Sequence, residues 1–211
     1  MKRLGIRGSA LALWALLAVS LPAWAGPSAV TVHVATRTLT VPVPPGMTVG
    51  SPQLVSAEQS AANPVPFRLV NVFTPGNAPV PGQGARLVLV ETDAGDGTIT
   101  PARFSRVKRL ATANVETLSR QATSTSTKKW NRPRVLVDTG HAFAWMAPAA
   151  EKNGSGVASA HGLKGMLYLS VCRRILVLSP RTDRASAAQA RWISHEVRWL
   201  GKAVRKANQS C

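Results

Sequence analysis

The sequence is poor in acidic residues: 9 Asp and Glu stand against 26 Lys and Arg, a formal net charge of +17 at pH 7. Such an excess favours polyanionic partners such as lipopolysaccharide, anionic lipid headgroups, acidic cell-wall polymer or extracellular nucleic acid. Aromatic residues make up only 5% of the chain and are not interleaved with the basic ones. Since single-stranded nucleic acid is usually held by stacking on aromatics, we expect nucleic acid to bind only through non-specific charge.

Long hydrophobic runs are missing after residue 25, and no later segment approaches the roughly 20 apolar residues that span a bilayer. Residues 1–25 have the three parts of a secretory signal peptide: basic residues near the start, an apolar stretch Ala10 to Leu21, and the small-x-small site Ala23-Trp24-Ala25. We therefore expect cleavage after Ala25, a periplasmic or secreted protein, and a single domain over residues 26–211.

Cysteine is limited to Cys172 and Cys211, and the four histidines, His33, His141, His161 and His195, are scattered. Two thiols without a neighbouring histidine do not make a zinc pattern, so no metal or other cofactor is predicted. An exported chain meets an oxidising compartment. We therefore predict a disulfide between Cys172 and Cys211 that holds the end of the chain against a hairpin.

Motifs of common enzyme classes are also missing, since the chain has no Gly-x-Ser-x-Gly nucleophile elbow and no Walker loop. One short stretch, Asp138-Thr139-Gly140 after the apolar run Val135 to Val137, resembles the active-site turn of aspartic proteases. That chemistry needs two carboxylates sharing a proton, so the resemblance implies a homodimer with Asp138 as the catalytic residue. The alternative is an ordinary turn aspartate, which we favour.

Alternation of apolar residues predicts strands or hairpins in several segments. The predicted strand segments are 29–34, 38–43, 67–73, 86–91, 166–171 and 175–178, while 134–146 is either a bent strand or a hairpin about Thr139-Gly140. A basic, exposed turn is expected at Cys172 to Arg174. A helix is predicted over 101–121 with Thr100 as its cap, because Thr-Pro is a common helix start. Flexible loops are expected near 46–66, 121–131 and 151–162.

A long amphipathic helix closes the chain. Ser186 and Gln189 have the spacing of a capping box, in which each side chain bonds one free backbone N–H. The buried side of the helix contains Ile193, Val197, Leu200, Val204 and Glu196. Burying an unpaired charge is costly, so the Glu196 carboxylate needs an interaction partner or contact with water. The other side collects cations, and we take five of them as anion-binding candidates: Arg191, Arg198, Lys202, Arg205 and Lys206. A merely solvated face is the alternative.

The order of these elements predicts an α+β fold, with a mainly antiparallel sheet packed against two principal helices in one domain. In element order, residues 67–208 resemble the small exported domains of the PsbP-like and DcrB-like kind, a resemblance that assigns no functional residue. We interpret the chain as an exported, non-catalytic binding or accessory module with a basic surface for anionic envelope components. A homodimeric aspartic protease and a structural domain with incidental charge are the alternatives.

Overall fold

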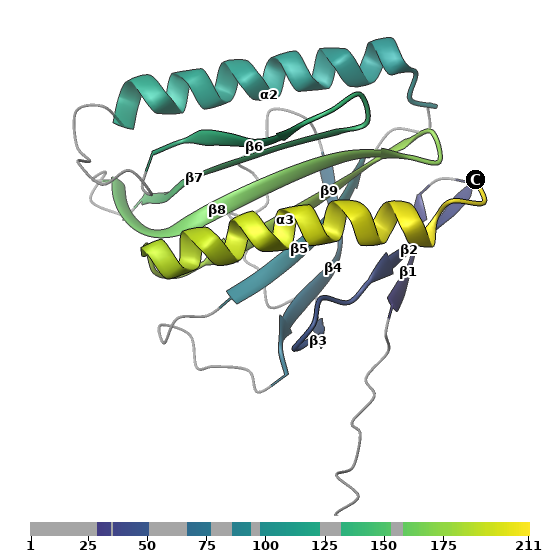
Figure 1. Ribbon diagram of the computed structural model, residues 1–211, viewed down its shortest axis with the longest axis horizontal. Helices are drawn as coiled ribbons and strands as arrows, with labels where there is room; N and C mark the ends of the chain where they lie inside the picture. Colours follow the sequence, from purple (N-terminus) through teal and green to yellow (C-terminus); the bar gives the residue numbers. More distant parts are fainter. Residues whose placement is uncertain are drawn as a thin grey trace, which may run out of the picture.

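The computed structural model describes residues 29–34, 36–50, 67–76, 86–93, 98–122, 132–152 and 158–211. Within them the protein has the predicted α+β fold, in which an antiparallel sheet packs against two helices (Figure 1). The expected signal peptide lies outside the described residues, as do residues 51–66, 123–131 and 153–157 of the predicted loops. No described helix is long and apolar enough to cross a membrane.

The described elements follow one another in the order that Figure 1 labels. They are β1 (Ala29–Val34), β2 (Arg37–Pro42), β3 (Met47–Gly50), β4 (Phe67–Pro75), β5 (Arg86–Asp93), α2 (Pro101–Ala122), β6 (Arg134–Asp138), β7 (Ala142–Lys152), β8 (Ala158–Val171), β9 (Arg174–Thr182) and α3 (Ala187–Ala207). Seven strands form one sheet in the order β3-β4-β5-β9-β8-β7-β6, and β1 pairs with β2 in a separate hairpin. Each strand pair is antiparallel.

The strand residues alternate between two apolar cores, one on each face of the large sheet. In β7, Phe143 and Trp145 belong to the core under α2, whereas Ala144 and Met146 belong to the core under α3. The β1–β2 hairpin adds its buried side chains to the α3 side. Because successive strand residues point to opposite faces, strands that lie between two covering layers are apolar at nearly every position.

Both helices begin as their caps predict. The Thr100 hydroxyl accepts a hydrogen bond from the Arg103 backbone N–H at 3.2 Å, and Pro101 opens α2. Ser186 accepts from the Gln189 N–H at 3.2 Å. The second half of the predicted capping box differs, because the Gln189 side-chain oxygen accepts from Arg86 Nε at 3.0 Å. Gln189 therefore ties the start of α3 to β5.

Gly165 on β8 lets α3 approach the sheet closely. A Cβ atom at this position would lie 2.6 Å from Ile193 Cγ2 and 2.9 Å from Pro180 Cγ. Both distances are well inside van der Waals contact, so any larger residue would push the helix away from the sheet or displace Pro180. The absence of a side chain at Gly165 therefore sets the height of α3 above β8.

The structure corrects three predicted loops and confirms one turn. Residues 47–50 form β3, which pairs with β4, and residues 158–162 form the start of β8, which pairs with β7. Gln121 and Ala122 continue α2. The segment 158–162 consists mostly of small residues with weak strand preference, and it is a strand because it pairs with the end of β7. The segment 47–50 is a strand because it pairs with residues 72–75 of β4. The segment 134–146 is the hairpin alternative, with β6 and β7 joined through Thr139, Gly140 and His141.

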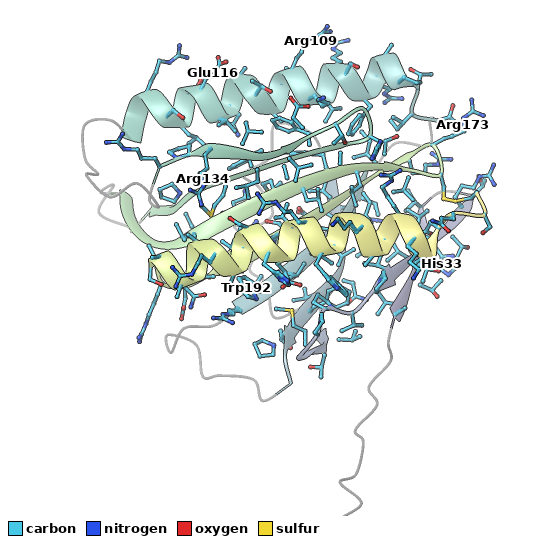
Figure 2. All side chains as sticks on the ribbon, in the orientation of Figure 1. His33, Arg109, Glu116, Arg134, Arg173 and Trp192 are labelled. Carbon is cyan, nitrogen blue, oxygen red and sulfur yellow. A yellow bond between two sulfur atoms is a disulfide. The ribbon has the colours of Figure 1, made fainter. Side chains whose placement is uncertain are left out.

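The β8–β9 turn differs from the prediction in one residue. Cys172 and Arg173 make the turn with φ values of 51° and 61°, the left-handed pair that a tight hairpin favours. Arg174 is not an exposed turn residue, because it begins β9 with only 4% of its surface exposed. Only Arg173 carries the expected exposed charge at the turn (Figure 2).

Candidate anion-binding site

The outer side of α3 carries the five predicted cations. Arg191, Arg198, Lys202, Arg205 and Lys206 are all exposed, while the inner side of the helix is buried through residues such as Ile193, Val197 and Leu200. This division follows the 3.6-residue period of the sequence. The buried face fixes the helix, and the charged face is left open to solvent.

A hollow of about 760 Å³ lies between α3 and the edge strand β6; we call it the β6 hollow. Its lining residues are Arg134, Val135, Leu136, Arg191, Ser194, His195, Arg198, Trp199 and Lys202. Three of the predicted cations meet Arg134 here, and Arg134 comes from a different element (Figure 2). Charges that converge from two elements on one concavity define a site more sharply than charges along one helix.

A second hollow of about 550 Å³ lies at the end of the helix; we call it the C-terminal hollow. It is lined by Ser170, Val171, Cys172, Lys202, Arg205, Lys206, Asn208 and Gln209. Lys202 lines both hollows, so they meet at that side chain. Among the lining residues that the structure describes, neither hollow contains an Asp or Glu that would neutralise the cations.

Arg205 also contacts the β6–β7 turn, where its Nη1 donates a hydrogen bond to His141 Nε2. Burial and the Arg205 charge lower the pKa of His141, which favours the neutral ring that can accept this bond. Arg205 is therefore held toward the turn by His141, while Lys206 and Lys202 have no such contact in the described part of the chain. The two lysines are the freer cations of the C-terminal hollow.

Glu196 lies beneath the cationic face and is 5% exposed. Its Oε2 is 3.9 Å from His195 Nδ1, and its Oε1 has no hydrogen-bond partner among the described residues. Burial raises the pKa of Glu196, although the neighbouring His195 and Arg86 oppose the shift. His195 is thus the partner that was expected for Glu196 from the sequence, although the contact is long. When Glu196 is protonated, it carries no negative charge to offset the cations on the outer side of the helix.

The start of α3 is held by Arg86 of β5. The Arg86 guanidinium lies 5.2 Å from the ring centroid of Trp192, a cation–π contact, and its Nε binds Gln189. Trp192 is thereby occupied on the side of the helix away from β6 (Figure 2). Trp199 remains as the aromatic side chain of the β6 hollow.

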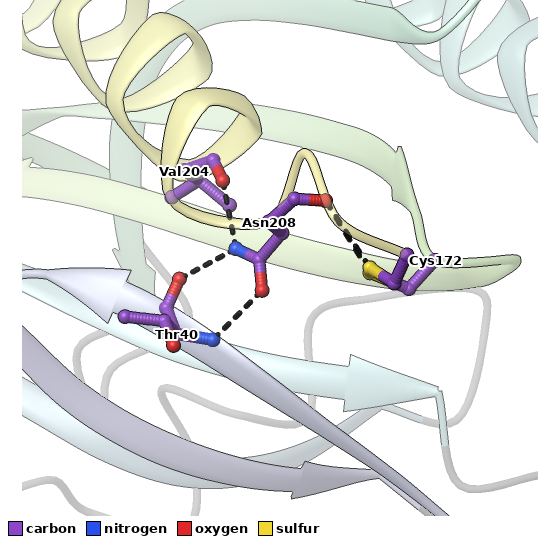
Figure 3. The surroundings of a disulfide bond; sticks show 5 residues. Thr40, Cys172, Val204 and Asn208 are labelled. Atoms are coloured by element: carbon purple, nitrogen blue, oxygen red, sulfur yellow. Dashed lines mark hydrogen bonds between the residues drawn. A yellow bond between two sulfur atoms is a disulfide. The ribbon is translucent and has the colours of Figure 1, made fainter.

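The end of α3 is held by a disulfide and by Asn208 (Figure 3). Cys172 and Cys211 are joined, with Cα atoms 5.2 Å apart. The Asn208 amide pairs with both backbone groups of Thr40 on β2: Oδ1 accepts from Thr40 N at 2.9 Å, and Nδ2 donates to Thr40 O at 2.7 Å. Nδ2 also donates to Val204 O at 2.7 Å. One side chain thus connects the helix end to the N-terminal hairpin.

Asp138, the candidate catalytic aspartate, is paired with a cation. Its side chain is 58% exposed at the end of β6 and forms an ion pair with Lys108 of α2. Lys108 also donates to the carbonyl oxygen of Thr139 at 3.0 Å. Aspartic protease chemistry needs a second carboxylate sharing a proton, and the described neighbour of Asp138 is an ammonium group. The local geometry is that of a turn anchored to a helix.

A buried charge cluster on the α2 side of the sheet was missed at the sequence level. Glu91 is fully buried, and neither of its carboxylate oxygens has a hydrogen-bond partner in the described part of the chain. Burial raises the pKa of Glu91, against the opposing charges of Arg181 and Lys164. Burial and the Arg181 charge lower the pKa of Lys164 to about 8, with Glu91 opposing. Lys164 and Arg181 lie beyond the ends of the predicted strand segments 166–171 and 175–178. They face each other, and lie near Glu91, only because β8 and β9 are longer than predicted.

The site has no metal-binding group among the described residues, and it includes two residues that were not predicted from the sequence. In the described residues no group of His, Cys, Asp or Glu is arranged to hold a metal ion. Arg134 and Trp199 were not predicted as site residues. Trp199 is partly buried against the core under α3, and Arg134 joins the site only through the pairing of β6 at the sheet edge. No local sequence pattern signals that pairing.

Comparison with known proteins adds little. No protein-family model and no curated protein sequence matches the chain significantly. Among solved structures the chain is similar to the Ran-binding protein Mog1p of Saccharomyces cerevisiae, with 16% identity and a TM-score of 0.37, over 85% of this chain and 93% of that one. A TM-score at this level supports neither a common fold nor a common function. The resemblance to PsbP-like and DcrB-like domains stays a prediction.

Proposed function

We propose that this protein is an exported, non-catalytic binding module that holds anionic components of the cell envelope in the groove along α3, formed by the β6 hollow and the C-terminal hollow. The observation that carries this proposal is the convergence of Arg134 with three α3 cations in one hollow whose described lining has no carboxylate. Export to the periplasm or the exterior is part of the proposal and comes from the sequence of residues 1–25.

The distribution of the charges distinguishes this proposal from the alternative of a structural domain whose positive charge has no function. The helix α2 also exposes arginines, among them Arg103, Arg106 and Arg109 on its outer side. They stand on a convex helix surface (Figure 2, Arg109), whereas the α3 cations line hollows that also contain apolar side chains. A concave surface brings several cations within a screening length of one anion, about 8 to 10 Å at physiological ionic strength.

A pair of matched triple variants tests the proposal. The groove variant is Arg191→Gln, Arg198→Gln and Lys202→Gln, and the control is Arg103→Gln, Arg106→Gln and Arg109→Gln on α2. Both lose the same charge from exposed positions of a helix. Binding to lipopolysaccharide micelles, to phosphatidylglycerol vesicles and to heparin is measured across a salt series.

We expect the groove variant to lose far more affinity than the control. On a linear polyanion, its slope of log K against log salt should fall by about 2, since each lost contact contributes roughly 0.7. Equal losses from the two variants would mean that only net charge matters, and the groove would not be a site.

A further inference from the structure

The two hollows lie one after the other along α3 and share the lining residue Lys202, which bears on what the proposed anion-binding groove holds. Lys202 lines both of them, the β6 hollow extends to Arg191, and the C-terminal hollow extends to Lys206 and Gln209. At 1.5 Å per helical residue, Arg191 and Lys206 are about 22 Å apart along the axis. A single phosphate or carboxylate would fill only a small part of this length.

The cations along the track are regularly spaced. Arg198, Lys202 and Lys206 follow at four-residue steps, about 6 Å apart along the axis, and Arg191 precedes Arg198 by seven residues on the same side of the helix. A ligand with one anionic group would contact one or two of these side chains. A chain with an anionic group at each repeat can contact all of them.

The walls between the cations are not uniformly polar. Val135, 45% exposed on the edge strand, lines the β6 hollow with Leu136 and Trp199. Ser170 and Gln209 add uncharged polar groups to the C-terminal hollow, whereas the Asn208 amide in its wall is already bonded to Thr40 and Val204. A sugar ring presents C–H faces to aliphatic and aromatic side chains and hydroxyls to amides, whereas a bare phosphate chain has no apolar face. Nucleic acid fits less well, because base stacking needs aromatic platforms, and the described lining offers only Trp199 and the smaller ring of His195.

We propose, on the basis of the anion-binding function above, that the groove holds one linear acidic glycan, laid along α3 across both hollows with its anionic groups on Arg198, Lys202 and Lys206. Lys202 is then the shared contact at the centre of the track. Chain length, and not only total charge, determines affinity.

Size-defined heparin oligosaccharides test the proposal on the mature protein, with calorimetry giving affinity and stoichiometry at fixed salt. Affinity should rise from the disaccharide until the chain covers about 22 Å and then level off. Disaccharides should bind at two places on each protein molecule, whereas chains of full length should bind one to one. The α2 triple variant should show the same length dependence as the unmodified protein.

Single substitutions, one in each hollow, test whether one ligand contacts both hollows. Arg198→Gln and Lys206→Gln should each weaken the full-length chain about threefold, as expected for exposed ion pairs, and together they should weaken it roughly tenfold. With disaccharides each variant should remove only one of the two binding events. Two binding events that persist with long chains, or an affinity independent of length, would overturn the inference while leaving anion binding intact.

Polyphosphate of matched length separates the glycan from other linear polyanions. It should bind more weakly, and Val135→Ser should lower the affinity for the glycan but not for polyphosphate. Equal affinity for both polymers, unmoved by Val135→Ser, would overturn the glycan assignment. A protein that binds neither oligosaccharides, lipopolysaccharide nor anionic vesicles would refute the proposed function itself.

Discussion

Asn208 provides the sharpest test of how the end of α3 is held. Its amide makes three hydrogen bonds, two to the backbone of Thr40 and one to the carbonyl of Val204. The two bonds to Thr40 imitate the pairing of a further strand beside β2, since one amide satisfies both an N–H and a C=O. Replacement by alanine removes all three bonds without disturbing the apolar core.

The magnitude follows from the number and the burial of these bonds. A typical intramolecular hydrogen bond contributes a net 0.5 to 1.5 kcal/mol, and these three are only partly buried, so Asn208→Ala should lower the free energy of unfolding by about 2 kcal/mol. For a chain of this size that corresponds to a fall in Tm of roughly 4 to 8 °C.

Urea and thermal unfolding, followed by circular dichroism, measure this loss. Gln209→Ala is the matched control, because Gln209 is the next residue, is exposed, and makes no hydrogen bond in the described part of the chain. The free energy of unfolding of the Gln209→Ala variant should stay close to that of the unmodified protein. The reasoning about Asn208 is refuted if Asn208→Ala and Gln209→Ala unfold at the same urea concentration.

Two other predictions follow from the disulfide and from the buried carboxyl of α3. The purified exported protein should show no alkylatable thiol until it is reduced and unfolded, and two thiols that alkylate in the native protein would contradict the bridge. Cys211→Ser should lower the free energy of unfolding by about 4 kcal/mol, because the bond closes a loop between residues 39 apart in sequence. Burial raises the pKa of Glu196 above its unfolded value, so its contribution to stability is present below pH 4.5 and is lost as pH rises through the folded pKa. In urea unfolding, the Glu196→Gln variant should therefore have the same free energy of unfolding as the unmodified protein near pH 4 and a progressively higher one toward pH 8. A difference in unfolding free energy that does not change with pH would contradict the raised pKa of Glu196.

The elements that the sequence predicted well are those whose signal is local. The Thr100 and Ser186 caps depend on residues within one helical turn, and the division of α3 into a buried and a charged face depends on a period of 3.6 residues. The hairpin at Cys172 was predicted from two adjacent apolar runs. In each case the residues that determine the structure are close in sequence, so a single stretch contains the information.

The elements that were missed depend on pairing partners that the local sequence of each segment does not reveal. Glycine and small residues near 158–162 suggested a loop, but β7 provides a paired partner for them, including Ala150 opposite Ala160. Arg134 enters the β6 hollow because β6 lies at the edge of the sheet next to α3, and Asn208 matters because β2 is opposite it. Propensity and periodicity describe what a segment favours alone, whereas these contacts depend on which strands become neighbours.

The anchoring of α3 at both ends connects the fold to the proposed function. Arg86 holds the start of the helix through Gln189 and Trp192, and the disulfide with Asn208 holds its end. Between these anchors, Gly165 brings the helix down onto β8. The backbone that carries the cations is therefore fixed before a ligand arrives, and binding has to order only the ends of long side chains, at roughly 0.5 to 1.5 kcal/mol for each immobilised side chain. A single exposed ion pair contributes about as little as that ordering costs, so one cation alone would bind hardly at all. A net gain requires several cations on one rigid track that engage the same ligand together, which is the arrangement that α3 presents.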